Sequence, residues 1–266
     1  MTDKKVMLVT GGAMGQGAMH AIEFAKIGYD CVLLDMQDPS DERFAATIAE
    51  AESYGATVLA IKTNICSTPE VEAAFAAAWE KFGRLDVVVA NAGIINFGYT
   101  WELEDAQVEA ALAVNLEGTW RTDKFAAKYM IEQGYGRIIN ISSVSGLRGT
   151  EKLASYVMTK HGINGLTKTL ALEMRNRGLP IYVNAICPTK VRTPMCETES
   201  YVEFVNTTMG KNFKTWQEMF EDEKNPGGLK FLNPIDITEM VIWLAESNAG
   251  TKLTGECLPI DRGAML

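Results

Sequence analysis

Histidine and cysteine are too scarce and too scattered in this sequence to build several common kinds of active site. The 266 residues include two histidines, His20 and His161, and five cysteines. An odd number of widely spaced cysteines without a C-x-x-C pair argues against a disulfide framework and against a zinc site. Two isolated histidines are too few for a multi-histidine metal centre. We therefore predict buried free thiols and no bound metal.

The sequence also lacks long apolar runs and a surplus of basic charge. No stretch reaches the roughly 18 uninterrupted apolar residues that a membrane span needs. The opening "MTDKKVMLVTGG" places charges before a short apolar run that ends at glycines, unlike a secretory signal. The net charge is -9, and no basic cluster typical of nucleic-acid binding is present. These absences predict a cytoplasmic protein with neither a nucleic-acid partner nor a membrane contact.

The sequence does contain a regular alternation of apolar, strand-like runs and amphipathic helical stretches. This alternation predicts an α/β fold, with a single doubly wound parallel sheet of the Rossmann type and helices on both faces. We expect residues 1–266 to form one dinucleotide-binding catalytic domain. The expected strands are 5–10, 30–35, 57–63, 85–90, 137–142, 180–187 and 256–260. The expected helices follow the glycine-rich turn up to residue 27 and then span 40–54, 68–82, 103–133 with a break near Gly118, 153–177 and 234–247.

Residues 190–233 interrupt the alternation and are rich in aromatic and methionine side chains. A connection of this length is typical of a functional loop, so we predict a helical substrate lid. Its apolar side chains could wall a substrate pocket, but they could equally pack the lid onto the body of the protein or form a subunit contact. The candidate pocket residues, on the lid and on neighbouring loops, are Ile95, Ser145, Leu147, Met195, Met209, Phe213 and Trp216.

The stretch "TGGAMGQG" follows the first expected strand and opens the first helix. Gly11, Gly15 and Gly17 lack Cβ atoms where the turn is tight and where backbone must approach a pyrophosphate, which the N–H groups at the start of a helix can bind. A glycine-rich turn can also serve structure alone. Asp35 ends the second strand, 18 residues after Gly17, where a carboxylate accepts both ribose hydroxyls and repels a 2'-phosphate. The combination favours NAD over NADP.

Further candidates for cofactor contact lie beside these motifs and at the ends of the third and fourth strands. Asn64 could meet the adenine edge, although a surface asparagine is as consistent with its position. The small residues of "NAG" at the end of the fourth strand could pass beneath the adenine ribose, and a simple turn would explain them too. The candidates in these places are Met14, Gln16, Met36, Asn64, Ile65, Asn91, Ala92 and Gly93.

Tyr156 and Lys160 are four residues apart on an expected helix, so their side chains share one face, with Cβ atoms about 5–6 Å apart. A free tyrosine titrates near pH 10, and a neighbouring ammonium favours its phenolate. Ser143 lies 13 residues upstream, just past the fifth strand, where its hydroxyl can hydrogen-bond a substrate oxygen. Taken alone, the tyrosine–lysine spacing also occurs by chance. Together with the glycine loop and Asp35, it indicates acid–base catalysis by the tyrosine.

With these motifs the chain resembles the short-chain dehydrogenases/reductases of the compact single-domain kind, along nearly its whole length. The matching stretches are "TGGAMGQG", "NAG", "VN" ending at Asn115, "ISSVSG" and "YVMTK". The resemblance implies that Ser143, Tyr156 and Lys160 are catalytic and that Asn115 holds a proton-relay water. It also implies cofactor contacts from Tyr156 and Lys160 and from the loop after the sixth strand. That loop supplies Pro188, Thr189 (where glycine is usual), Val191 and Thr193.

A narrower likeness is carried by "GQGAMHA", "WRT", "KHG" and "PTKVRTPM". These stretches are similar to the carveol-dehydrogenase-like branch, which oxidises cyclic secondary alcohols with NAD. The resemblance further implies a homotetramer. We therefore predict an NAD(H)-dependent oxidoreductase that interconverts a secondary alcohol and a ketone of a small, cyclic or otherwise apolar molecule. An acyl-type 3-ketoreductase using NADPH and a non-catalytic nucleotide-sensing protein are the alternatives.

Overall fold

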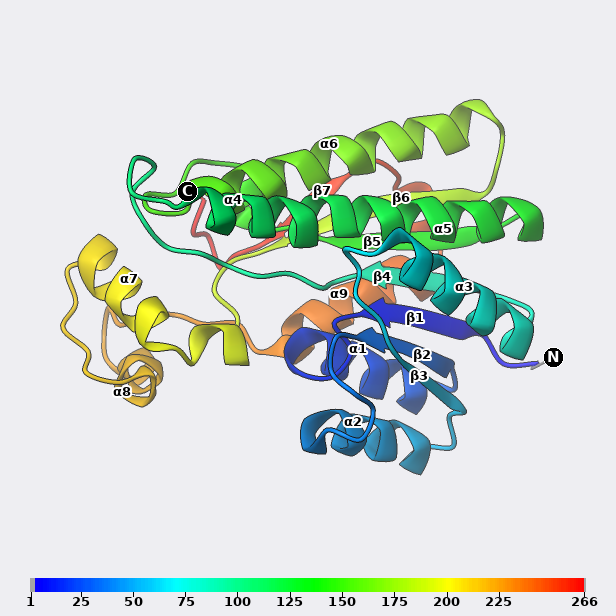
Figure 1. The fold of residues 1–266 in the computed structure, drawn as a ribbon, viewed down its shortest axis with the longest axis horizontal. Coiled ribbons are helices and arrows are strands. Elements are labelled where there is room, and N and C mark those ends of the chain that lie inside the picture. The colour runs from blue at the N-terminus through cyan, green and yellow to red at the C-terminus, as the bar shows by residue number, and fades with distance from the viewer. Residues whose placement is uncertain (1–2, 266) are drawn as a thin grey trace.

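A single parallel sheet forms the centre of the computed structural model, which describes residues 3–265 (Figure 1). The strands run in the order β3-β2-β1-β4-β5-β6-β7, and every neighbouring pair is parallel. The predicted doubly wound sheet is therefore confirmed, and the ends of its strands lie within one or two residues of those expected. The strands are β1 (Val6–Thr10), β2 (Asp30–Asp35), β3 (Val58–Lys62), β4 (Val87–Ala90), β5 (Gly136–Ile141), β6 (Ile181–Pro188) and β7 (Cys257–Ile260).

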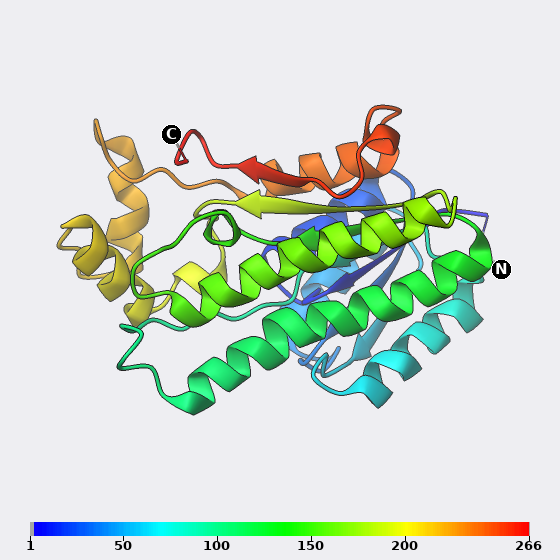
Figure 2. The same cartoon turned by 90° about the horizontal axis from the view of Figure 1, so that it is seen from above.

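Helices cover both faces of this sheet, as Figures 1 and 2 show. One face is covered by α1, α2 and α9, and the other by α3, α5 and α6. The helices of these layers are α1 (Gly15–Lys26), α2 (Glu42–Ser53), α3 (Thr68–Phe82), α4 (Asp105–Ala111), α5 (Gly118–Gln133), α6 (Ala154–Asn176) and α9 (Pro234–Glu246). None of the helices described for residues 3–265 combines the length and the apolar character that a membrane span requires.

Strand β1 shows why the sheet needs both layers. Successive side chains of a strand point to opposite faces. Met7 and Val9 accordingly pack into the core beneath α1 and α9, whereas Val6 and Leu8 pack into the core beneath α3 and α5. All four side chains are fully buried. An apolar residue at every position is the pattern of a parallel strand covered on both sides, which is how the sequence reveals it.

The long helix predicted for 103–133 differs from expectation at its start and in its middle. It begins at Asp105, where Glu104 and Gln107 form a reciprocal capping box. The expected break near Gly118 is instead a π-helical segment, η1 (Leu112–Glu117), and α5 continues from it without interruption. Gly118 has a packing role, because a Cβ atom there would lie 2.6 Å from the Cδ1 atom of Ile65. The glycine thus lets α5 approach the loop after β3 rather than ending the helix.

The segment 190–233 folds into helices that lie beyond the carboxyl ends of the strands (Figure 1). It contains α7 (Glu199–Met209) and α8 (Trp216–Glu221), flanked by the short 3-10 turns η3 (Pro194–Cys196) and η4 (Asp222–Lys224). Thr198 and Thr215 cap the two helices by accepting hydrogen bonds from backbone N–H groups. The segment has an apolar cluster of its own, separate from the two cores of the sheet. We refer to residues 190–233 as the lid.

Three buried polar side chains connect α5, β5 and α6 through hydrogen bonds. The amide of Asn140 donates hydrogen bonds to Asp123 Oδ2 and to Thr167 Oγ1, each at 3.0 Å. Burial raises the pKa of the Asp123 carboxyl to about 7. The folded protein therefore keeps this proton up to about pH 7, whereas an unfolded chain releases it near pH 4. Between these values the folded state binds more protons, so Asp123 makes the free energy of unfolding decrease as the pH rises.

We expect Asp123→Asn to remove this contribution, because an amide of the same shape does not ionise. Relative to the unmodified protein, the variant should gain on the order of 2–4 kcal/mol in free energy of unfolding between about pH 5 and about pH 8. Urea unfolding at several pH values measures the difference. Asp105→Asn, at an exposed position, serves as the control. Parallel stability–pH curves for Asp123→Asn and the unmodified protein would contradict the assignment.

Candidate active site

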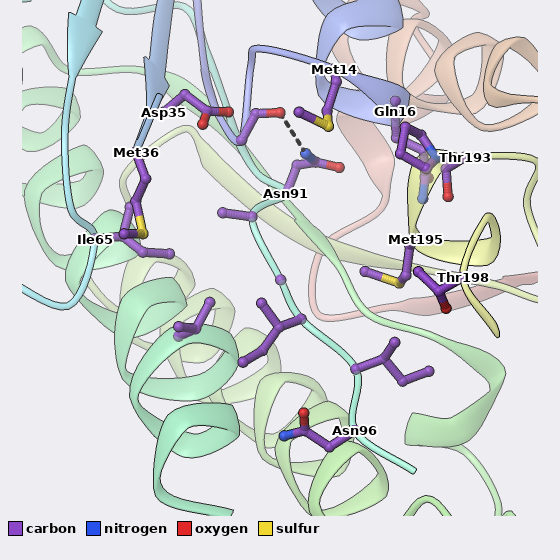
Figure 3. A pocket seen from close by; sticks show the side chains of 18 of the residues that line it. Met14, Gln16, Asp35, Met36, Ile65, Asn91, Asn96, Thr193, Met195 and Thr198 are labelled. Atoms are coloured by element: carbon purple, nitrogen blue, oxygen red, sulfur yellow. Dashed lines mark hydrogen bonds between the residues drawn. The ribbon is translucent and has the colours of Figure 1, made fainter. Parts of the chain in front are cut away.

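Two adjoining cavities open at the carboxyl edge of the sheet, beside the point where β1 is flanked by β2 and β4. The larger has a volume of about 700 Å³ and the smaller about 160 Å³. In Figure 3, Asp35, Met36 and Ile65 lie toward one end of the larger cavity, and Thr193, Met195 and Thr198 lie toward the other. The residues common to both cavities are Gln16, Asn91, Gly93, Ile95, Thr193 and Met195. The two cavities therefore adjoin along a shared wall.

The glycine loop forms one side of the larger cavity, and its backbone requires glycine. Gly11 and Gly15 have φ angles of 70° and 61°, which other residues rarely adopt. Gly17 does not line the cavity, but a Cβ atom there would overlap the carbonyl oxygen of Gly11. The Oε1 atom of Gln16 is buried without a hydrogen-bond partner among residues 3–265. A close-packed turn that only glycine can form and the backbone N–H groups of a helix N-terminus together fit the diphosphate of a dinucleotide.

Asp35 lies at the far end of the same cavity, where the backbone fixes its carboxylate. Ala13 N donates to Oδ2 and Gln37 N donates to Oδ1, both at 3.0 Å. Each oxygen can accept a further hydrogen bond, as two ribose hydroxyls would require. Met14, Met36 and Ile65, predicted to contact the cofactor, also line this cavity.

Asn64 does not line either cavity. Its side-chain oxygen accepts a hydrogen bond from Cys66 N at 3.0 Å, so it closes a local turn. Its neighbours Thr63 and Ile65 line the larger cavity in its place. The predicted contact of Asn64 with a cofactor is therefore not supported by its position.

The loop after β4 forms the floor between the two cavities. The amide of Asn91 donates to the backbone oxygens of Thr10 and Gly11, at 3.0 and 3.4 Å, and so ties the floor to the glycine loop. Ala92 N donates to Thr10 Oγ1 at 3.1 Å. At Gly93 a Cβ atom would lie 3.3 Å from the Oδ1 atom of Asn115. Small residues here leave the cavity open above the floor.

Ser143, Tyr156 and Lys160 all line the smaller cavity. Ser143 follows β5, and its hydroxyl donates to the Pro188 backbone oxygen at 3.4 Å while accepting from Ser145 N at 3.1 Å. Tyr156 and Lys160 lie on α6, with the Lys160 Nζ atom 5.4 Å from the centre of the tyrosine ring. This ammonium is almost fully buried and donates to the Ile141 backbone oxygen at 2.7 Å. The structure thus brings the three predicted catalytic residues together.

The pKa values of this group differ from the sequence expectation. Burial raises the pKa of Tyr156 to about 12, and a hydrogen bond with Ser143 offsets part of that effect. Burial also lowers the pKa of Lys160 to about 8. The lysine was expected to lower the pKa of the tyrosine, but in the protein alone desolvation is the larger effect on both groups. Spacing along a helix predicts that the two side chains are near each other, whereas desolvation depends on what surrounds them.

Asn115 lies in the π-helical segment η1 and is completely buried. Its side chain exchanges hydrogen bonds with both backbone groups of Ile94, at 2.8 and 2.9 Å, and donates to Thr159 Oγ1 at 3.2 Å. Thr159 immediately precedes Lys160. The π segment, a feature frequent at functional sites, therefore joins the floor of the cleft to the catalytic helix.

The loop after β6 passes over the glycine loop. Pro188, Thr189, Val191 and Thr193 line the smaller cavity, and a Cβ atom at Gly15 would lie 3.5 Å from the Thr193 Cβ. Thr189 stands where glycine is usual in the family that the motifs resemble. Its N–H donates to the Ile260 backbone oxygen at 3.0 Å, and its φ angle is not positive. Threonine therefore fits this backbone without strain.

The predicted substrate pocket is only partly as expected. Ile95, Ser145, Met195 and Met209 line the smaller cavity, but Leu147, Phe213 and Trp216 line neither cavity. Phe213 and Trp216 pack against the apolar cluster of the lid. Asn206 holds the backbone of Phe213 through two hydrogen bonds of 2.8 Å, and the ring of Trp216 packs edge-on against Phe220 at 5.6 Å.

Other residues of the smaller cavity were not among the site residues predicted from sequence. They include Arg148, Thr150, Leu153 and Lys190. Arg148 follows Ser143 by five residues, and Lys190 follows Pro188 by two. The signal that could have indicated them is their position just past two catalytic or cofactor motifs at the carboxyl ends of strands.

Comparison with known proteins agrees with this geometry. The family model described as short chain dehydrogenase matches residues 5–202. A protein named an uncharacterized NAD-dependent oxidoreductase, from Mycobacterium tuberculosis, is 38% identical and covers 98% of this chain and 96% of its own. A 3beta-hydroxysteroid dehydrogenase of Mediterraneibacter gnavus is 39% identical, covering 98% of this chain and 95% of its own.

Among solved structures, carveol dehydrogenase from Mycobacterium avium in complex with NAD is similar, with a TM-score of 0.87 and 26% identity. The match covers 98% of this chain and 97% of that one. The resemblance to short-chain dehydrogenases and to their carveol-dehydrogenase-like members, drawn from the motifs, is thereby confirmed. The protein is an oxidoreductase that belongs to the short-chain dehydrogenase family.

Proposed function

We propose that the protein uses NAD to interconvert a secondary alcohol and a ketone, with residues 1–266 acting as one catalytic domain and the lid covering the substrate. The observation that carries this proposal is the shared wall of the two cavities. Ser143, Tyr156 and Lys160 line the smaller cavity, while the glycine loop and Asp35 line the larger. A dinucleotide held by Asp35 at one end therefore reaches the catalytic residues at the other.

The bound cofactor would supply a hydride acceptor for the carbinol carbon during oxidation, and in its reduced form a hydride donor for the carbonyl carbon. The hydroxyl of Ser143 would hydrogen-bond the substrate oxygen and orient it towards Tyr156. Tyr156, as the phenolate, would take the proton of the alcohol during oxidation, and as the phenol would donate it back during reduction. Lys160 stabilises the phenolate electrostatically, in opposition to burial, and Asn115 holds the floor next to it.

The choice of cofactor follows from the fixed carboxylate of Asp35. It presents acceptors for two ribose hydroxyls, and its charge repels a 2'-phosphate. Asp35 is the one ionisable side chain that lines the larger cavity within the described part of the chain, so no cation there favours NADP. An NADPH-dependent ketoreductase is correspondingly disfavoured.

The substrate class rests on the wall of the smaller cavity and on the names of the relatives. Ile95, Met195, Phe204 and Met209 supply apolar surface close to Tyr156. Relatives named for carveol and for a hydroxysteroid act on ring alcohols, which fit such a wall. We therefore propose a cyclic or otherwise apolar secondary alcohol. The family resemblance also supports a cytoplasmic homotetramer, which analytical ultracentrifugation and cell fractionation would test.

Removal of the Tyr156 hydroxyl tests the acid–base role directly. We expect Tyr156→Phe to lower kcat by at least about 100-fold, because general acid–base catalysis contributes roughly 10²–10⁴-fold. NADH affinity, measured by fluorescence titration, should stay nearly unchanged. Tyr129→Phe, a ring packed against Trp79 away from both cavities, should keep full activity. A Tyr156→Phe variant that kept more than about a tenth of kcat would exclude this role.

Replacement of Asp35 tests the choice of cofactor. Asp35→Ala removes both the ribose acceptor and the repulsion of a 2'-phosphate. We expect kcat/KM for NAD to fall by about tenfold to a hundredfold, as for a lost hydrogen bond to a charged group, while kcat/KM for NADP rises. Asp38→Ala, at an exposed position outside both cavities, is the matched control. Comparable kcat/KM for NADP and NAD in the unmodified enzyme would favour the NADPH-dependent alternative.

A further inference from the structure

The smaller cavity carries an excess of positive charge. Arg148, Lys160 and Lys190 line it, and no aspartate or glutamate among the described residues does. The whole chain has the opposite balance, with a net charge of -9. Cations without an acidic residue beside them in the lining of one cavity, in a protein that is acidic as a whole, favour an anionic ligand there.

Two of these three cations have no partner in the part of the chain that the structure describes. Lys160 donates to the Ile141 backbone oxygen. No ion pair or side-chain hydrogen bond joins Arg148 or Lys190 to another described residue. Other cations of the lid differ in this respect, because Arg192 pairs with Glu223 at 2.8 Å and Lys211 with Asp222 at 3.0 Å. In the lid, acidic side chains therefore pair with Arg192 and Lys211, whereas Lys190, which lines the smaller cavity, has no acidic partner among the described residues.

At the position of Lys190, an unpaired positive charge is energetically unfavourable unless an anion binds beside it. The side chain is partly buried, and burial together with the nearby charge of Arg148 lowers the pKa of Lys190. Arg148 is exposed, so the cost falls on Lys190, a partly desolvated cation beside a second cation, which a bound anion would stabilise. The diphosphate of the cofactor is expected at the glycine loop in the larger cavity, which neither Arg148 nor Lys190 lines.

Arg148 and Lys190 lie on chain segments that also carry residues of the proposed active site. Arg148 belongs to the segment that begins with Ser143, and Lys190 belongs to the loop that begins with Pro188. The Ser143 hydroxyl donates to the Pro188 backbone oxygen, so the two segments are joined next to the reacting group. The same cavity also presents the Ser145–Thr150 hydroxyl pair, 3.1 Å apart, and apolar surface from the lid.

We propose that the substrate is an anionic secondary alcohol or ketone whose carboxylate is bound by Arg148 and Lys190 while its apolar ring lies against the lid. This inference rests on the proposed function and narrows its substrate class. An arginine and a lysine converging on one cavity suit a carboxylate, which accepts charge-assisted hydrogen bonds from both. The two residues would select the substrate and would take no part in the chemistry.

Matched pairs of alcohols test the proposal. We would assay the NAD-dependent oxidation of 4-hydroxycyclohexanecarboxylate and of 4-(4-hydroxycyclohexyl)butanoate, each beside its neutral primary amide. Two tether lengths allow for the span between the cations and Tyr156. For at least one length, kcat/KM should be about tenfold to a hundredfold higher for the acid than for the amide.

Charge removal assigns the preference to the two residues. Lys190→Gln and Arg148→Gln should each lower kcat/KM for the acid by about tenfold, mainly through KM, and leave the amide within about twofold. NADH affinity should not change. Lys128→Gln, an exposed lysine that pairs with Glu72, is the control and should alter neither substrate. Equal activity towards acid and amide in the unmodified enzyme, parallel losses for both in the variants, or weakened NADH binding would overturn the proposal.

A binding measurement separates this inference from the proposed function. Calorimetric titration of the NADH-saturated enzyme with cyclohexanecarboxylate, 4-cyclohexylbutanoate and their amides needs no turnover. Tighter binding of an acid, lost in Lys190→Gln and Arg148→Gln, would support the anion site even if no alcohol were oxidised, in which case the proposed reaction alone would fail. Oxidation of the amides without any preference for the acids in either assay would leave the reaction standing and reject the anion site.

Discussion

The site depends on the parallel pairing of β1 with β2 on one side and with β4 on the other. Crossovers leave the centre of the sheet in both directions, so the segments that follow β1 and β4 diverge and leave a crevice at the carboxyl edge. Thr10, the last residue of β1, accepts hydrogen bonds from Asn91 N and Ala92 N and fixes the two sides of that crevice. Because β5 and β6 are parallel to these strands, Ser143 and the loop after Pro188 lie at the same edge.

Tyr156 and Lys160, the proposed catalytic pair, lie where burial opposes their charged forms. Lys160 donates a hydrogen bond to the Ile141 backbone oxygen and lies beside a partly buried Tyr156. Desolvation raises the pKa of Tyr156 and lowers the pKa of Lys160, so it disfavours the charged form of each. A site of this kind is prepared for the additional positive charge that an oxidised nicotinamide brings, which favours the phenolate only when the cofactor is present. In the proposed mechanism, the activation of Tyr156 therefore depends on the bound cofactor.

The parts of the molecule that could be predicted from sequence are those fixed by local constraints. Buried parallel strands are apolar at every position, as in β1, and the turn at Gly11 and Gly15 needs positive φ angles, so both leave clear patterns. The placing of Phe213 and Trp216 in the pocket was wrong, because a dense aromatic segment does not reveal which side chains form its own core. Arg148 and Lys190 were missed because a sequence shows charges but not whether they are paired. The chemical roles of Ser143, Tyr156 and Lys160 stay predictions that rest on their convergence in one cavity.

The central claim is that a hydride passes directly between a secondary alcohol in the smaller cavity and a nicotinamide at the end of the larger one. The most direct measurement oxidises a cyclic secondary alcohol that carries deuterium on its carbinol carbon and follows the label by mass spectrometry. Our account predicts that the deuterium is recovered in the reduced cofactor, on one face of the ring, with none released to water. Deuterium in the solvent, or ketone formed without reduced cofactor, would contradict it.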